Sequence, residues 1–150
     1  MYYELMLYIL LGGIIMFQWK EEYKLGVDFV DEQHKKLFEI SSRAYELLNN
    51  SLAIDKYDRI MEIISELKDY TVFHFSQEEE YLIKNNYKKL LSHKIEHDAF
   101  IRKFAEIDLN KVEYQQDAYI LDILEFLSKW IIDHILIRDK HYSETIKKEA

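Results

Sequence analysis

The distribution of apolar residues predicts a protein built from long helices. Through most of the chain, apolar side chains recur every three or four positions, with polar residues between them. This spacing places the apolar side chains on one face of an α-helix. Four such stripes, which include several polar residues, are Val30, His34, Leu37, Ala44 and Leu48; Ile60, Ile63, Ile64, Leu67, Thr71, His74, Glu78 and Leu82; Leu90, His93, His97, Phe100, Phe104 and Ile107; and Ile120, Ile123, Leu127, Trp130, Ile131 and His134.

Short polar clusters separate the four stripes, at residues 49–51, 85–86 and 108–110. The chain has no proline and three glycines, but Asn and Asp tolerate the turn conformations that glycine usually supplies. Short turns between long helices make neighbouring helices antiparallel. We therefore predict an all-α fold, an up-down-up-down antiparallel four-helix bundle, with residues 17–30 as an N-terminal arm that turns at Gly26.

The composition narrows the functions open to such a bundle. The 150 residues suit one domain, which is apolar enough to bury a core. The net charge of −8 argues against nucleic-acid binding, because an acidic surface repels a phosphate backbone. The lack of cysteine excludes disulfides, thiol catalysis, iron–sulfur clusters and thiolate metal sites.

The first residues differ from the rest of the chain. Residues 5–17 form a run of 13 apolar residues, whereas a membrane-spanning helix needs about 20. The run also lacks the preceding positive charge and the clear cleavage site of a signal peptide. We expect residues 1–15 to be an apolar leader or start-site extension and residues 16–150 to be the domain, in a cytoplasmic protein without firm membrane association. A weak membrane or partner anchor is the alternative.

Histidines mark the helix faces where chemistry is expected. Five of the six histidines lie on the apolar stripes, and each stripe carries at least one. A helical core offers few hydrogen-bond partners for buried imidazoles, whereas a metal ion would satisfy several together. His74 and Glu78 are four residues apart, as are His93 and His97, so each pair shares a helix face. In the predicted bundle all these residues fall at the same end, where they could converge in one layer.

The types of ligand narrow the choice of metal. Imidazoles with a carboxylate and no thiolate suit iron, zinc, copper or nickel. Five imidazoles and at least one carboxylate are too many for one tetrahedral ion and about right for two. Two close cations need a bridging anion, for which Glu78 and Asp139 are candidates. The adjacent Glu79 and Glu80 are expected to belong to a solvated face.

The spacing of His134 and Asp139 poses a geometric problem for the fourth helix. On a regular α-helix, five residues place the two side chains about 140° apart. Either the helix contains a one-residue π-bulge, or it crosses the metal site so that each side chain reaches in from one flank. Because no glycine or proline marks a distortion, we expect the crossing. We also expect His141 at the surface and a hydrogen bond from Tyr142 to Asp139.

Several sequence strings combine into one ordered pattern. They are Trp19 with Leu25-Gly26-Val27, Asp31-Glu32-Gln33-His34, His74-Phe75-Ser76-Gln77-Glu78-Glu79, His93-Lys94-Ile95-Glu96-His97, and Trp130-Ile131-Ile132-Asp133-His134 followed by Asp139. Over about residues 17–145, this pattern resembles the hemerythrin family, specifically its single-domain bacterial members. The combination is far more specific than any one of its strings.

The resemblance implies a non-haem diiron centre and a full set of ligands. By it, one iron would be held by His93, His97 and His134, the other by His34 and His74, and both would be bridged by Glu78, Asp139 and an oxo or hydroxo group. The iron with two histidines would keep an open position where dioxygen binds. The residues that would wall the oxygen pocket are Leu37, Phe75, Trp130, Ile131 and Ile135.

The function implied by the resemblance is reversible dioxygen binding for storage, delivery or buffering, without enzymatic turnover. Five neutral imidazoles and two carboxylates leave two ferrous ions under-neutralised, which favours the reduced state. Apolar walls also limit access of water and protons. The alternative is an oxygen or redox sensor that acts through a separate partner. A peroxide- or nitric-oxide-reacting enzyme and a simple metal store are further hypotheses, and an unidentified oxygen-using or electron-transfer protein is a candidate partner.

Overall fold

A computed structural model describes residues 18–150 apart from 51, 53, 109 and 111, and describes residues 112–116 by their backbone alone. The leader expected at residues 1–15 lies outside the described residues. Within them the ordered elements are helical, and no strand is present. No described helix is both long and apolar enough to cross a membrane.

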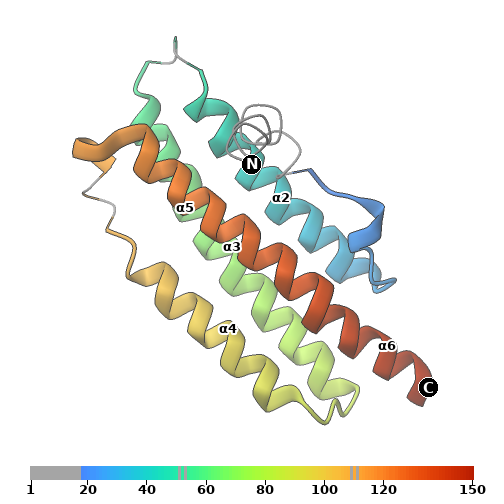
Figure 1. The fold of residues 1–150 in the computed structure, drawn as a ribbon. Coiled ribbons are helices and arrows are strands. Elements are labelled where there is room, and N and C mark those ends of the chain that lie inside the picture. The colour runs from blue at the N-terminus through green and yellow to red at the C-terminus, as the bar shows by residue number, and fades with distance from the viewer. Residues whose placement is uncertain (1–17, 51, 53, 109, 111) are drawn as a thin grey trace, which may run out of the picture.

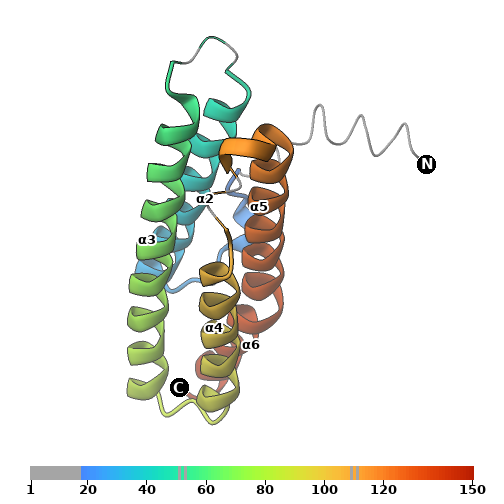
Figure 2. The ribbon, with the colours of Figure 1, turned by 90° about the vertical axis from the view of Figure 1, so that its left-hand side faces the viewer.

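The helices pack as antiparallel neighbours in a bundle of four rods (Figures 1 and 2), as the sequence predicts. The fourth rod is composite, because three consecutive elements continue along one axis (Figure 1). After the short 3₁₀ helix η1 (Glu21–Tyr23), the rods of the described chain are α2 (Asp28–Leu48), α3 (Lys56–Lys84), α4 (Leu90–Ala105) and the succession α5 (Val112–His134), η3 (Ile135–Asp139) and α6 (Lys140–Glu149). α2 packs against α3 and α5, and α3 packs against α4.

The turns use left-handed residues where the sequence lacks glycine. Asn86, between α3 and α4, has a φ of 53°, in agreement with the turn expected there. The turn between α2 and α3 extends further than its polar cluster suggests, because α3 begins after Asp55, which has a φ of 52°. Gly26 in the N-terminal arm has a φ of 77°, which confirms the predicted turn.

The N-terminal arm is tied to two helices by its backbone. The carboxylate of Asp31 on α2 accepts hydrogen bonds from the backbone N–H groups of Leu25 (2.8 Å) and Gly26 (2.9 Å). The carbonyl of Leu25 in turn accepts bonds from the Ser143 hydroxyl (3.0 Å) and the Lys147 ammonium (2.6 Å) on α6. The arm therefore fixes α6 against the start of α2.

The apolar stripes form the core, which is divided along the bundle axis. The half near the α2–α3 turn is filled by fully buried aliphatic side chains, among them Ile60, Ile64, Ile120 and Leu124. Burial of each such side chain contributes about 1.5–3 kcal/mol to folding. The opposite half contains the histidines, so the stability of the aliphatic half supports a polar interior that would be costly by itself.

Candidate metal centre

The seven predicted site residues meet in one buried layer. None is more than 6% exposed, and they come from every rod of the described bundle. The members of this metal-site cluster are His34 on α2, His74 and Glu78 on α3, His93 and His97 on α4, His134 on α5 and Asp139 on η3. The seven residues thus lie at the same end of the bundle, as expected.

Imidazole nitrogens approach one another at two places in the cluster. The Nε2 atoms of His34 and His74 are 3.1 Å apart, and those of His97 and His134 are also 3.1 Å apart. Two ligands bound at a right angle to one ion by bonds of about 2.1 Å are about 3.0 Å apart. Both pairs therefore have the spacing of neighbouring ligands to one metal ion.

Glu78 connects the two places. Its Oε2 atom lies 3.2 Å from the Nε2 atoms of both His93 and His97. Two groups of possible ligands have donor atoms within 4.8 Å of one another, and Glu78 belongs to both: Glu78, His93, His97 and His134 form one, and His34, His74 and Glu78 form the other. A carboxylate in this position could bridge two ions.

Asp139 spans the same two groups from the opposite side. Its Oδ2 atom is 3.3 Å from His34 Nε2, and its Oδ1 atom is 3.2 Å from His134 Nε2. Both carboxylate oxygens are fully buried, yet neither makes a hydrogen bond within the described part of the chain. Because buried carboxylate oxygens require a compensating partner, Asp139 fits a role as a metal ligand.

The π-helical segment η3 solves the spacing problem of His134 and Asp139. The backbone N–H of Lys140 bonds to the carbonyl of Ile135, five residues earlier, so the chain takes one more residue in this turn than an α-helix. The extra residue brings Asp139 onto the side of the helix occupied by His134. The expected crossing of a regular helix is therefore wrong. The π turn forms in a segment that contains neither glycine nor proline.

Tyr142 donates a hydrogen bond into the cluster, to Glu78 and not to Asp139 as expected. Its hydroxyl is 2.6 Å from Glu78 Oε1, and the side chain is fully buried. The π turn changes the direction of all later residues, and this places Tyr142 opposite α3. His141, by contrast, is exposed and bonds through Nδ1 to the Tyr87 hydroxyl (2.9 Å), away from the cluster as expected.

Three side chains lie close to the outer nitrogens of histidines in the metal-site cluster. Gln33 Oε1 is 2.8 Å from His74 Nδ1, and Glu79 Oε1 is 3.0 Å from His97 Nδ1. Glu96 Oε2 is 3.4 Å from His134 Nδ1. Gln33 and Glu79 accept a hydrogen bond from Nδ1 and so direct the lone pair of Nε2 into the cluster, whereas Glu96 lies at ion-pair distance from the third ring.

Sequence reasoning missed these three residues, and its assignment of Glu79 to a solvated face is wrong. The side chain of Glu79 is 18% exposed and faces His97, whereas Glu80 is exposed as expected. One signal was available. Gln33, Glu79 and Glu96 are each adjacent in sequence to a residue of the cluster.

The protonation states suit a cation site. Burial, together with the neighbouring His34, lowers the pKa of His74 to about 3, which keeps this imidazole neutral and free to bind a metal. Burial opposes ionisation of Glu78, but His93 and His97 hold the pKa of its carboxyl well below the ordinary value. Burial alone would lower the pKa of His97, but Glu78 and Glu79 raise it above the ordinary value. The surroundings of His97 therefore favour a positive charge.

The five residues expected to wall an oxygen pocket all lie in or beside the core. Leu37, Phe75, Ile131 and Ile135 are buried, and Trp130 is partly buried. The Phe75 ring stacks on His97, with centroids 3.7 Å apart, and Trp130 stacks on His134 at 4.4 Å. Both aromatic rings thus pack against histidines of the group formed by Glu78, His93, His97 and His134.

The fold and the site together define a class: a four-helix bundle with a buried histidine- and carboxylate-lined site for two metal ions. The model of the hemerythrin HHE cation-binding domain matches residues 25–146. The chain therefore belongs to the hemerythrin family, and a pair of non-haem iron ions is the cofactor of its domain. The histidine-rich donor set without thiolate fits that cofactor.

Named relatives agree with this membership. The chain is 52% identical over 127 residues to a bacteriohemerythrin of Clostridium acetobutylicum, a match that covers 85% of this chain and 98% of the relative. It is 32% identical over 122 residues to the bacteriohemerythrin of Methylococcus capsulatus, covering 81% and 88% of the two chains. A crystal structure of a leucine-to-phenylalanine mutant protein superposes with a TM-score of 0.63 at 28% identity and covers 80% of this chain and 88% of that one.

Proposed function

We propose that this chain binds dioxygen reversibly at its diiron centre and thereby stores, delivers or buffers oxygen. Oxygen binding is the function of its family; the physiological use is our inference. The observation that carries the proposal is the unequal distribution of nitrogen donors. Three histidines contact Glu78 or Asp139 on one side of the cluster, and two lie together on the other.

We propose the following ligands for the two irons. His93, His97 and His134 would hold one iron, His34 and His74 would hold the other, and Glu78 and Asp139 would contact both. The position of Glu78 in both ligand groups supports this assignment, as do the contacts of Asp139 with His34 and His134. The iron with fewer protein ligands keeps room for an exogenous molecule.

The surroundings of the site favour binding over turnover. When loaded, the iron pair supplies the electrons that bind oxygen. The chain's own residues exclude water, since the cluster and the apolar walls around it are buried. The Tyr142 hydroxyl donates its hydrogen bond to Glu78, so it is not available to protonate a molecule bound in the site.

Anaerobic iron loading followed by oxygen titration tests the proposal. Metal analysis should give two irons per chain, and an oxygen-dependent absorption band should appear on oxygenation and vanish when oxygen is removed. His141→Ala is the matched control, because it removes a histidine outside the cluster and should leave both results unchanged. Zinc as the bound metal, or continuous oxygen consumption with a reductant, would contradict the proposal.

A further inference from the structure

The two halves of the metal-site cluster differ in what supports their histidines from behind. On the two-histidine side, the Nδ1 of His74 faces the neutral amide of Gln33 at 2.8 Å. On the three-histidine side, the Nδ1 of His97 faces the carboxylate of Glu79 at 3.0 Å, and Glu96 is 3.4 Å from His134 Nδ1. One half thus has charged support and the other has neutral support.

Each of these carboxylates is held in place by a cation from a neighbouring element. Glu79 on α3 pairs through Oε2 with Lys94 on α4 at 3.2 Å, which leaves Oε1 for His97. Glu96 on α4 accepts two bonds from Arg138 on η3, at 3.0 Å from Nε and 2.6 Å from Nη2. These pairs cross between elements, so they fix the direction of each carboxylate toward its imidazole.

The charge behind an imidazole changes what the imidazole gives to a metal. A carboxylate that accepts the Nδ1 proton makes the ring a more basic ligand, and a more basic ligand stabilises the higher charge of an oxidised ion. An amide oxygen acts in the same direction but carries no net charge. Two irons held at this site would therefore experience different ligand strengths, even though every nitrogen donor is an imidazole.

We propose that Glu79 and Glu96 are positioning residues that make the iron on the three-histidine side the more easily oxidised and the more tightly held of the pair. The proposal rests on the ligand assignment given above. It specifies a division of labour, in which the two-histidine iron combines the open position with the weaker electron donation. Gln33 contributes by keeping a carboxylate away from that iron.

Single isosteric substitutions test this division. Glu79→Gln and Glu96→Gln remove the charge and keep the shape, and Gln33→Glu adds a carboxylate on the opposite side. The oxidation of the iron pair is followed by a spectroelectrochemical titration in two one-electron steps, and iron release to a chelator is timed separately. Far-UV circular dichroism checks that each variant remains helical.

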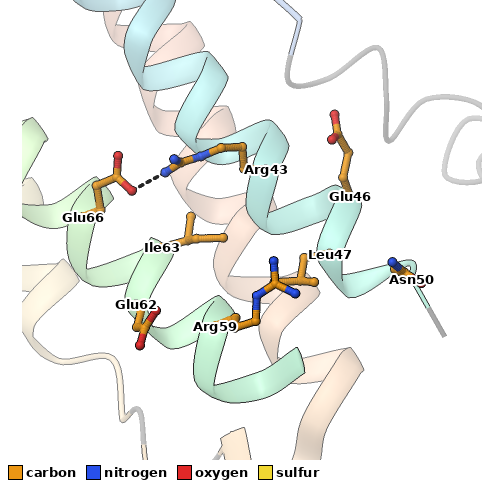
Figure 3. Close-up of a pocket in the computed structure, with 8 residues that line it drawn as sticks. All are labelled: Arg43, Glu46, Leu47, Asn50, Arg59, Glu62, Ile63 and Glu66. Carbon is orange, nitrogen blue, oxygen red and sulfur yellow. Dashed lines mark hydrogen bonds and ion pairs between the residues drawn. The ribbon is translucent and has the colours of Figure 1, made fainter. Parts of the chain in front are cut away.

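Glu66→Gln is the matched control (Figure 3). Glu66 pairs with Arg43 across α2 and α3, and the two side chains are 43% and 41% exposed, against 31% and 54% for Glu96 and Arg138. It precedes His74 by eight residues, which is more than two helical turns. Glu66→Gln therefore removes the same type of ion pair from a residue that contacts none of the proposed ligands.

We expect the two kinds of variant to move different steps. Glu79→Gln and Glu96→Gln should raise the potential of the first oxidation by at least tenfold in the oxidised-to-reduced ratio, which is about 59 mV for one electron. They should also release one of the two irons about 10- to 100-fold faster. Gln33→Glu should instead lower the potential of the second oxidation, and the Glu66→Gln control should change neither.

The result that overturns the proposal is a first-step potential that stays at the wild-type value in both glutamine variants. Equal shifts of both steps would also overturn it, because they would show a general field and not support of one iron. Failure of the proposed function is distinguishable, since it would show in the wild type as missing irons or irreversible oxygenation. A protein that binds two irons but oxygenates irreversibly still permits the potential measurements.

Discussion

The hydroxyl of Tyr142 permits a quantitative test of the contacts around the metal site. Tyr142→Phe removes one oxygen atom from a fully buried side chain and leaves the ring in its place. The lost bond, 2.6 Å long, ends on Glu78, whose carboxyl is kept ionised by His93 and His97. Hydrogen bonds to charged groups contribute a net of about 1.5–3 kcal/mol to stability. The free energy of unfolding of the iron-free protein should fall by that amount.

For a chain of 150 residues, this loss corresponds to a Tm lower by roughly 3–12 °C. Urea unfolding in the presence of a chelator, followed by far-UV circular dichroism, measures it. Tyr87→Phe is the comparison, because its hydroxyl bonds to the exposed His141 and carries a neutral-bond value of about 0.5–1.5 kcal/mol at most. If Tyr142→Phe costs no more than Tyr87→Phe, the bond to Glu78 does not stabilise the site as argued.

Three further predictions concern the ligands, the pH and the leader. Asp139→Asn keeps the shape but not the charge, and metal analysis should find fewer than two irons per chain while the circular dichroism stays helical; full iron content would remove Asp139 from the ligand set. Because His74 has a pKa of about 3 when folded and about 6.5 when unfolded, the unfolded chain binds more protons between these values, and the free energy of unfolding of the iron-free protein should fall as the pH drops below about 6.5. Urea midpoints that are flat from pH 7 to pH 4 would contradict this. A protein that begins at Met16 should match the full chain in iron content and oxygen binding, and aggregation of that protein would show that the leader is needed.

The bundle and the meeting of the metal-site cluster could be predicted because both depend on helical periodicity. His74 and Glu78 share a stripe with Ile64 and Leu67, so the rule that assigns the core also assigns these members of the metal-site cluster. Antiparallel order then places His34 and His97 at the same end of the bundle. Contacts that need only helix faces and heights follow from the sequence.

The supporting contacts could not be predicted in the same way. Glu79 and Glu96 lie one position off their stripes, where periodicity alone groups them with solvent-facing residues. Each lies beside an imidazole and also pairs with a cation on a neighbouring element, a contact that helix periodicity does not specify. The π turn likewise has no mark in the sequence, because the five residues of η3 include neither glycine nor proline.

Because of the π turn, the fourth rod contains one residue more than a regular α-helix of the same length would need. Deletion of Ile137, which is 63% exposed, would leave His134 and Asp139 four positions apart on an ordinary α-helix and keep everything after them in place. Deletion of Lys140, three residues further on, would instead rotate Tyr142 by about 100° away from Glu78. We therefore expect the fourth rod to tolerate a one-residue deletion before Asp139 but not after it. The extra residue of the π turn lies in the segment before Asp139.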